Sequence, residues 1–135
     1  MTKKEAVQIL AILKAAYPSS YNGMTKEEAS GTVGIWAMQF ASMPVDIVMM
    51  AVQKLIATNK FPPSIAEVKE KIKSIHWEAY ELAYGSLAQS MPKETIEQFC
   101  RIYEATQEYK YGKTYEPPIY QMLSHNQQKQ IGSGE

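Results

Sequence analysis

The stretch SIAEVKEKIKSIHWEAYELAY, residues 64–84, decides the fold because neither glycine nor proline interrupts it. Ser64 and Glu67 have the spacing of a capping box, in which the serine hydroxyl accepts a hydrogen bond from the Glu67 amide and the glutamate carboxylate accepts one from the Ser64 amide. A Pro-Pro pair just before them keeps the approach extended, since a residue that precedes proline is disfavoured in the helical region. We therefore predict one helix of about 30 Å, with Phe61 packing beside its first turn.

The apolar side of this helix is expected to change part-way along. Its first apolar stripe comprises Ile65, Val68, Ile72 and Ile75. Its second comprises Trp77, Tyr80, Tyr84, Leu87 and Met91. Both stripes step by three and four residues, the spacing of one helical face, but the jump from residue 75 to residue 77 turns the stripe by roughly 200°. The helix is thus predicted to show one face to an N-terminal bundle and the opposite face to a following element.

Three further helices are predicted ahead of this one. Capping-box spacing begins at Thr2 and again at Thr25, and Pro44 suits the first turn of a third helix because its missing amide hydrogen would be unpaired there. Gly31 and Gly34 weaken the second helix by roughly 1 kcal/mol each relative to alanine. Their expected use is the close approach of a neighbouring helix.

Beyond residue 91 the chain is expected to turn back. Pro92 suits a helix start, and an apolar stripe follows it, so this segment and the preceding helix should form a helical hairpin. From Gly112 the sequence is polar and has few apolar residues to offset the entropy of ordering. The predicted fold is all-α: a small four-helix bundle over residues 1–75, a helical hairpin over 76–111, and a flexible tail over 112–135 with one short apolar island.

Composition and charge exclude several classes of function. Fourteen Lys and Arg residues balance fourteen Asp and Glu residues, so the net charge demands neither a polyanionic partner nor a membrane surface. Cys100 is the only cysteine, which fits a reducing cytoplasm. No window approaches the about 20 apolar residues of a membrane span, and the first residues lack the pattern of an export signal. We therefore expect a soluble cytoplasmic protein.

No catalytic or cofactor-binding motif stands out. His76 and His125 lack partners at metal-ligand spacing, and the apolar neighbours of Cys100 favour a core or interface position over a reactive thiol. A Cys–His nucleophile pair stays open on composition alone. There is neither a phosphate-binding glycine loop nor a nucleophile elbow, so the sequence predicts a protein that is not an enzyme and holds neither cofactor nor metal.

Two groups of side chains indicate binding functions. Lys60, Lys69 and Lys73 could contact phosphate groups, but acidic residues are interleaved with them, which favours a solvated helix face. Tyrosines near the end of the chain, among them Tyr109 and Tyr115, could stack on bases. A protein-binding surface suits these tyrosines better because tyrosine is common at contacts that are part apolar and part polar, and the hairpin core would account for some of them equally well.

Short motifs in a fixed order occupy about residues 1–75. They are Thr2-Lys3-Lys4-Glu5 with Ile9-Leu10, Ala16-Tyr17-Pro18, Met24-Thr25-Lys26-Glu27-Glu28 ahead of Trp36, and Phe61-Pro62-Pro63-Ser64-Ile65. In these motifs the chain resembles the bacteriophage helicase loader and inhibitor family. The resemblance implies a small helical N-terminal domain followed by a flexible C-terminal region. Residues 76–111 depart from that picture because they look structured here.

The resemblance implies a role in phage DNA replication. Members of that family bind the ring-shaped hexameric replicative helicase, hold it inactive, and deliver it to phage origin DNA through an origin-binding replisome organiser, so that DNA is contacted only indirectly. Their C-terminal part makes the helicase contact. Carried onto this chain, the candidate contact residues are Ile119, Tyr120, Met122 and Leu123, with Tyr109 and Tyr115 beside them.

Two other functions stay open at this point. One is a nucleic-acid-binding replication accessory protein that acts through the lysines and tyrosines without a helicase partner. The other is a dimeric helical scaffold built on the hairpin. Binding to DNA at low salt distinguishes the first from a helicase loader, and sedimentation of the isolated protein reveals the second.

Overall fold

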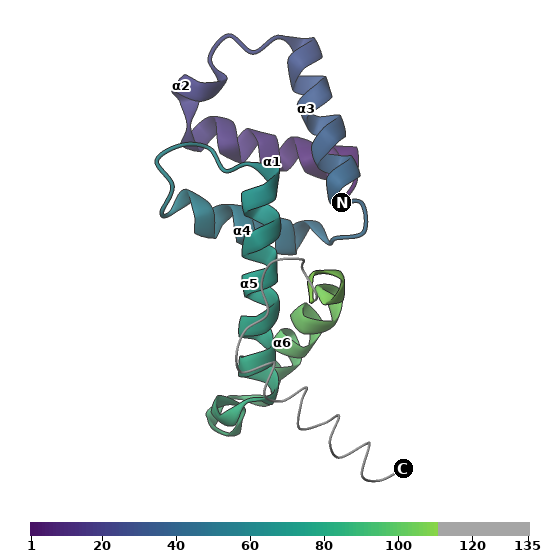
Figure 1. The fold of residues 1–135 in the computed structure, drawn as a ribbon, viewed down its shortest axis with the longest axis vertical. Helices are drawn as coiled ribbons and strands as arrows, with labels where there is room; N and C mark the ends of the chain where they lie inside the picture. The colour runs from purple at the N-terminus through teal and green to yellow at the C-terminus, as the bar shows by residue number, and fades with distance from the viewer. Residues whose placement is uncertain (111–135) are drawn as a thin grey trace.

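The structure is a computed structural model that describes residues 1–110, and these residues form helices joined by short turns, with no strand among them (Figure 1). The α-helices are α1 (Lys3–Ala16), α2 (Pro18–Tyr21), α3 (Lys26–Gln39), α4 (Val45–Ile56), α5 (Ile65–Tyr84) and α6 (Lys93–Ala105), and the 3-10 turns are η1 (Ser86–Ser90) and η2 (Gln107–Tyr109). The all-α class is confirmed, and no helix in this range is both long and apolar enough to cross a bilayer. The predicted tail, residues 112–135, lies outside the described residues.

Capping side chains set the starts of the main helices. At α5 the Ser64 hydroxyl accepts from the Glu67 amide and the Glu67 carboxylate accepts from the Ser64 amide, both at 3.1 Å. The box at Thr2 is complete in the same way, whereas at Thr25 only the bond to the hydroxyl forms. Each bond satisfies a backbone donor that the helix itself leaves unpaired. The predicted helix starts are therefore explained by local chemistry.

Apolar side chains from all the long helices form one continuous core. Its largest fully buried members include Ile9, Leu13, Phe40, Ile47, Val48, Val52, Val68 and Ile72. We call α1–α4 the head, and α5 enters it with its first half. Figure 1 shows α1 and α4 lying across α5 rather than alongside it, so the predicted four-helix bundle is not confirmed.

The second half of α5 and α6 form the expected hairpin, in which α6 folds back beside α5 (Figure 1). The apolar face, however, does not switch to the opposite side of α5. His76, Ala79 and Ala83 are buried, and at about 100° per residue they continue the face of Ile72. The small alanine side chains let α6 approach on that side, so the predicted 200° rotation is wrong.

The hairpin tip also differs from the predicted stripe. Within that stripe Trp77 is buried, but Tyr84 and Leu87 are 54% and 57% exposed. The reason is that α5 ends at Tyr84 and η1 replaces the helix from Ser86 onward. A stripe spaced for a continuous helix therefore loses its alignment beyond Gly85.

Polar contacts join the hairpin to the head. Arg101 of α6 pairs with Asp46 of α4 at 2.7 Å, and the Ser42 hydroxyl donates to the Glu108 carboxylate at 2.8 Å. These side chains are exposed, so each contact contributes little to stability by itself. The apolar residue Ile102 of α6 is buried in the common core, and it makes the stronger connection.

Gly31 and Gly34 do not serve the close approach that was predicted for them. A Cβ atom placed on either glycine would meet nothing within 4 Å. Both lie on α3 away from the core, whereas Trp36 and Phe40 of the same helix are buried. The prediction is wrong for the described residues, because the neighbouring helices pack on the other side of α3.

Candidate protein-interaction surface

Exposed apolar side chains are the main candidates for function in residues 1–110. Six large apolar residues are more than half exposed there: Val7, Ile35, Met38, Phe61, Tyr84 and Leu87. Single exposed apolar residues are ordinary, but residues gathered on one surface mark protein-binding sites. Ile35 and Met38 share α3, and Tyr84 and Leu87 lie at the hairpin tip.

Phe61 projects from a loop that is fixed on both sides. Its side chain is 70% exposed, while Pro63 two residues later is buried. Upstream, the Tyr17 hydroxyl donates to the Asn59 carbonyl at 2.8 Å, and the Lys60 ammonium lies 5.7 Å from the Phe61 ring centroid. The predicted packing of Phe61 beside the start of α5 is therefore wrong, because Pro63 takes the buried position.

Replacing Phe61 with alanine is expected to change the free energy of unfolding by less than about 0.5 kcal/mol, since an exposed ring contributes little packing. Urea denaturation followed by circular dichroism measures this quantity. The matched control is Phe40→Ala, which removes a fully buried ring and should cost about 3–5 kcal/mol. A loss at Phe61 of the size seen at Phe40 would show that the ring packs in solution.

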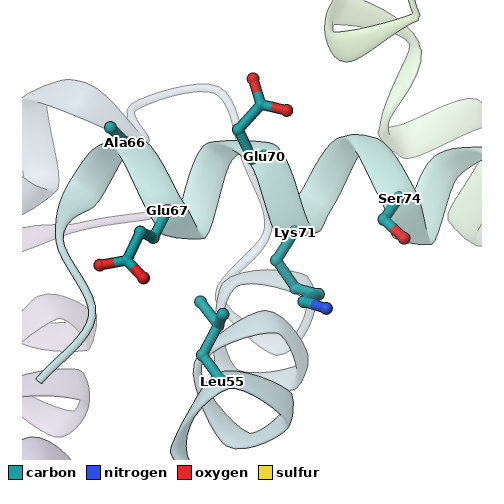
Figure 2. A pocket seen from close by; sticks show the side chains of 6 residues that line it. All are labelled: Leu55, Ala66, Glu67, Glu70, Lys71 and Ser74. Carbon is teal, nitrogen blue, oxygen red and sulfur yellow. The ribbon is translucent and has the colours of Figure 1, made fainter. Parts of the chain in front are cut away.

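A shallow groove between α4 and α5 lies beside this loop. Its lining residues are Leu55, Ala66, Glu67, Glu70, Lys71 and Ser74. Figure 2 shows Glu67 and Lys71 reaching toward Leu55, with Glu70 pointing away. Hydrogen bonds from the Ser64 amide and the Asn59 side chain lower the pKa of Glu67, so this carboxylate stays ionised and engaged in capping. The groove offers a contact surface and no acid–base pair.

His76 is buried between the two hairpin helices and has a structural role. Its Nδ1 lies 2.8 Å from the Thr106 hydroxyl, which itself donates to the Ile102 carbonyl, so Nδ1 carries the proton. The ring stacks on Tyr103 with centroids 4.5 Å apart. Burial, and then the charge of Lys110, lower the pKa of His76 to about 4, so the ring is neutral at pH 7.

The sequence pattern treated His76 as a residue between two stripes and missed this contact. Its partner Thr106 lies 30 positions away, and no local spacing indicates the pair. Cys100 is half-buried, as its neighbours predicted. Among residues 1–110, no three His, Cys, Asp or Glu side chains lie close enough together to hold a metal ion.

The three candidate DNA-binding lysines do not form one exposed strip. Lys60 is exposed beside Phe61. Lys69 donates to the Gln39 side chain at 2.6 Å and lies 5.9 Å from the Phe40 ring centroid. Lys73 is only 3% exposed. Their separation weakens the argument for a phosphate-binding surface, which needs several cations on one accessible face.

Of the predicted partner-binding residues, the structure describes Tyr109 alone. Tyr109 is half-buried against the core, and burial together with the charge of Glu108 raises the pKa of its hydroxyl to about 12. The others lie outside the described residues: Tyr115, Ile119, Tyr120, Met122 and Leu123. Their role in binding stays a prediction.

Comparison with known proteins places the head in a family. The family model for the N-terminal domain of a phage helicase loader and inhibitor matches residues 1–69. The chain belongs to this family. Membership in the phage loader/inhibitor family confirms the resemblance drawn from the sequence motifs, and it gives the chain a regulatory role in phage DNA replication at the level of the family. No curated protein and no solved structure gives a significant match.

The family match covers α1 to α4 and ends inside α5. The matched region therefore includes the α3 surface and the Phe61 loop, while the hairpin tip and α6 lie beyond it. The part of the chain that matches the loader/inhibitor family is the part that builds the head.

Proposed function

We propose that this chain binds the hexameric replicative helicase, holds it inactive, and delivers it to phage origin DNA through an origin-binding replisome organiser. The observation that carries the proposal is membership of the phage loader/inhibitor family over residues 1–69. The chain would act in the host cytoplasm, by binding rather than by turnover. The exposed apolar residues of the described range supply contact surface for protein partners.

The helicase contact is proposed for the apolar island Ile119, Tyr120, Met122 and Leu123, with Tyr109 and Tyr115 flanking it. This island lies within residues 117–128, which contain no Lys, Arg, Asp or Glu. A sparsely apolar segment that orders on its partner binds with lower affinity per unit area. That property suits a loader, which must later release the helicase.

The test is a pair of charge substitutions in the full chain, Met122→Glu with Leu123→Glu. We expect at least a tenfold loss of affinity for the purified hexameric helicase, about 1.4 kcal/mol, because two apolar contacts become charged groups that burial disfavours. Fluorescence anisotropy of the labelled chain measures the affinity. Circular dichroism should show unchanged helix content.

The matched control is Gln127→Glu with Gln128→Glu, which adds the same charge at polar positions and should leave binding unchanged. Equal losses in both variants would point to a general charge effect and reject the island as the contact. Failure of the unmodified chain to bind the helicase would reject the proposed function itself.

A nucleic-acid-binding accessory protein is the competing function, and exposed Lys60 is the observation that favours it. The same labelled chain, titrated with single-stranded and double-stranded DNA at low salt, should show weak binding or none. Tight binding that falls steeply with salt would support the accessory function instead.

A further inference from the structure

The outer face of α3 is apolar although it points away from the core. We use the term α3 outer face for Gly31, Gly34, Ile35 and Met38. Ile35 and Met38 are 52% and 70% exposed, while Trp36 and Phe40 fill the inner side of the same helix. A surface helix ordinarily carries polar and charged residues opposite its buried stripe, so this face has the composition of a contact surface.

The α3 outer face also lies in the longest uncharged stretch of the chain. Residues 29–45 contain no Lys, Arg, Asp or Glu. The charges of α3 are confined to its first turn, at Lys26, Glu27 and Glu28. A partner of this face must therefore be matched by shape and apolar contact.

The shape of the face is a notch followed by a ridge. Over Gly31 and Gly34 the position of a Cβ atom is open, with no atom of the chain within 4 Å. One turn further on, Ile35 and Met38 project into solvent. Small residues on a helix let another helix approach closely, and neither glycine serves any helix of the described head in this way.

We propose that the α3 outer face pairs with the same face of a second copy of this chain, with the two α3 helices antiparallel. A two-fold axis near the middle of the face would place Ile35 and Met38 of each copy over the glycines of the other. The same patch then serves both subunits, as an isologous contact requires. Antiparallel pairing also opposes the helix dipoles and keeps the two copies of Glu27 apart.

The absence of charge favours a second copy over other partners. In a contact with itself, any charged group near the two-fold axis meets its own like charge, which costs binding energy. Residues 29–45 meet the condition of having none. One helix face is small beside the roughly 1,200–2,000 Å² of a stable interface, so the dimer is weak and exchanges with monomer.

A weak contact of this kind becomes effective when several copies are held together. On a ring with repeated binding sites, neighbouring copies would be linked and their binding strengthened without any new contact to the ring. This consequence rests on the proposed function, whereas the self-association does not depend on the helicase.

Sedimentation equilibrium of the full chain alone tests the proposal. We expect a monomer–dimer equilibrium with a Kd on the order of 100 µM. Ile35→Glu with Met38→Glu should weaken dimerisation at least tenfold while circular dichroism stays unchanged, since both side chains are exposed. Val7→Glu, which alters an exposed apolar residue of α1, is the matched control and should leave the dimer unchanged. A monomer at every concentration would overturn the proposal.

A second variant separates dimer loss from misfolding. Gly31→Ala with Gly34→Ala removes helix-weakening residues and fills the notch, so the melting temperature should rise while the dimer weakens severalfold. An unchanged or stronger dimer would overturn the antiparallel arrangement. Protection of the α3 outer face from hydrogen exchange in a purely monomeric sample would assign its cover to another part of the chain, which also contradicts the proposal.

Discussion

Lowering the pH from 7 to 4 is expected to reduce the free energy of unfolding by about 3 kcal/mol through His76. Burial, followed by the charge of Lys110, lowers the folded pKa of this residue to about 4, against 6.5 for an unperturbed imidazole. Between these two values the unfolded chain binds a proton that the folded chain rejects. The stabilising effect is therefore fully present above pH 6.5, declines as the pH falls through the window, and levels off below pH 4.

Urea denaturation at a series of pH values measures this loss. The control is His76→Gln, whose amide can still donate to the Thr106 hydroxyl but does not titrate. His125 is present in both proteins, so the difference between their pH profiles isolates His76. If the variant kept the full pH dependence between 6.5 and 4, another group would be responsible.

Replacing Ile72 with alanine is expected to lower the free energy of unfolding by about 3 kcal/mol and to affect the head and the hairpin equally. Ile72 is fully buried in α5, and its core cluster includes residues of α1, α3, α4 and α6. The lost methylene contacts and the remaining cavity account for the size of the effect. Because the cluster is continuous, we expect the described part of the chain to unfold as one unit.

Two tryptophans make this prediction testable. Trp36 lies in the head and Trp77 in the hairpin, so Trp77→Phe leaves a reporter for the former and Trp36→Phe leaves one for the latter. In each background the two fluorescence transitions should coincide, before and after Ile72→Ala. Ser74→Ala, at an exposed position of the same helix, should cost less than about 0.5 kcal/mol. Separate midpoints would instead support independent domains that divide near residue 75.

The starts of the helices could be predicted because their causes are local. The Ser64–Glu67 and Thr2–Glu5 capping boxes form as expected, and an uninterrupted stretch of good helix formers became α5. Pro18 ended α1 as predicted, although it then opened the single turn α2, which short-range spacing did not indicate. The family motifs also lie in short runs of sequence, so the family could be predicted from them.

The errors arise where the structure depends on contacts between distant residues. Which side of α5 is buried was decided by α6, whose approach is set by Ala79 and Ala83 rather than by the larger aromatic residues. Phe61 is exposed because Pro63 fills the site beside the helix. The two glycines of α3 face solvent because its neighbours pack on the opposite side. In the candidate surface, Ile35 and Met38 were missed because nothing in local spacing says which side of an apolar helix is covered.

The unbroken course of α5 from the head to the hairpin tip has a mechanical consequence. A helix without an internal proline or glycine has no built-in hinge, so α5 acts as a rigid lever about 30 Å long. A tilt of roughly 10° at its buried end would carry the far end by about 5 Å, by the same geometry. Any molecule that grips Tyr84 and Leu87 at the tip could therefore apply torque directly to the packing around Val68 and Ile72.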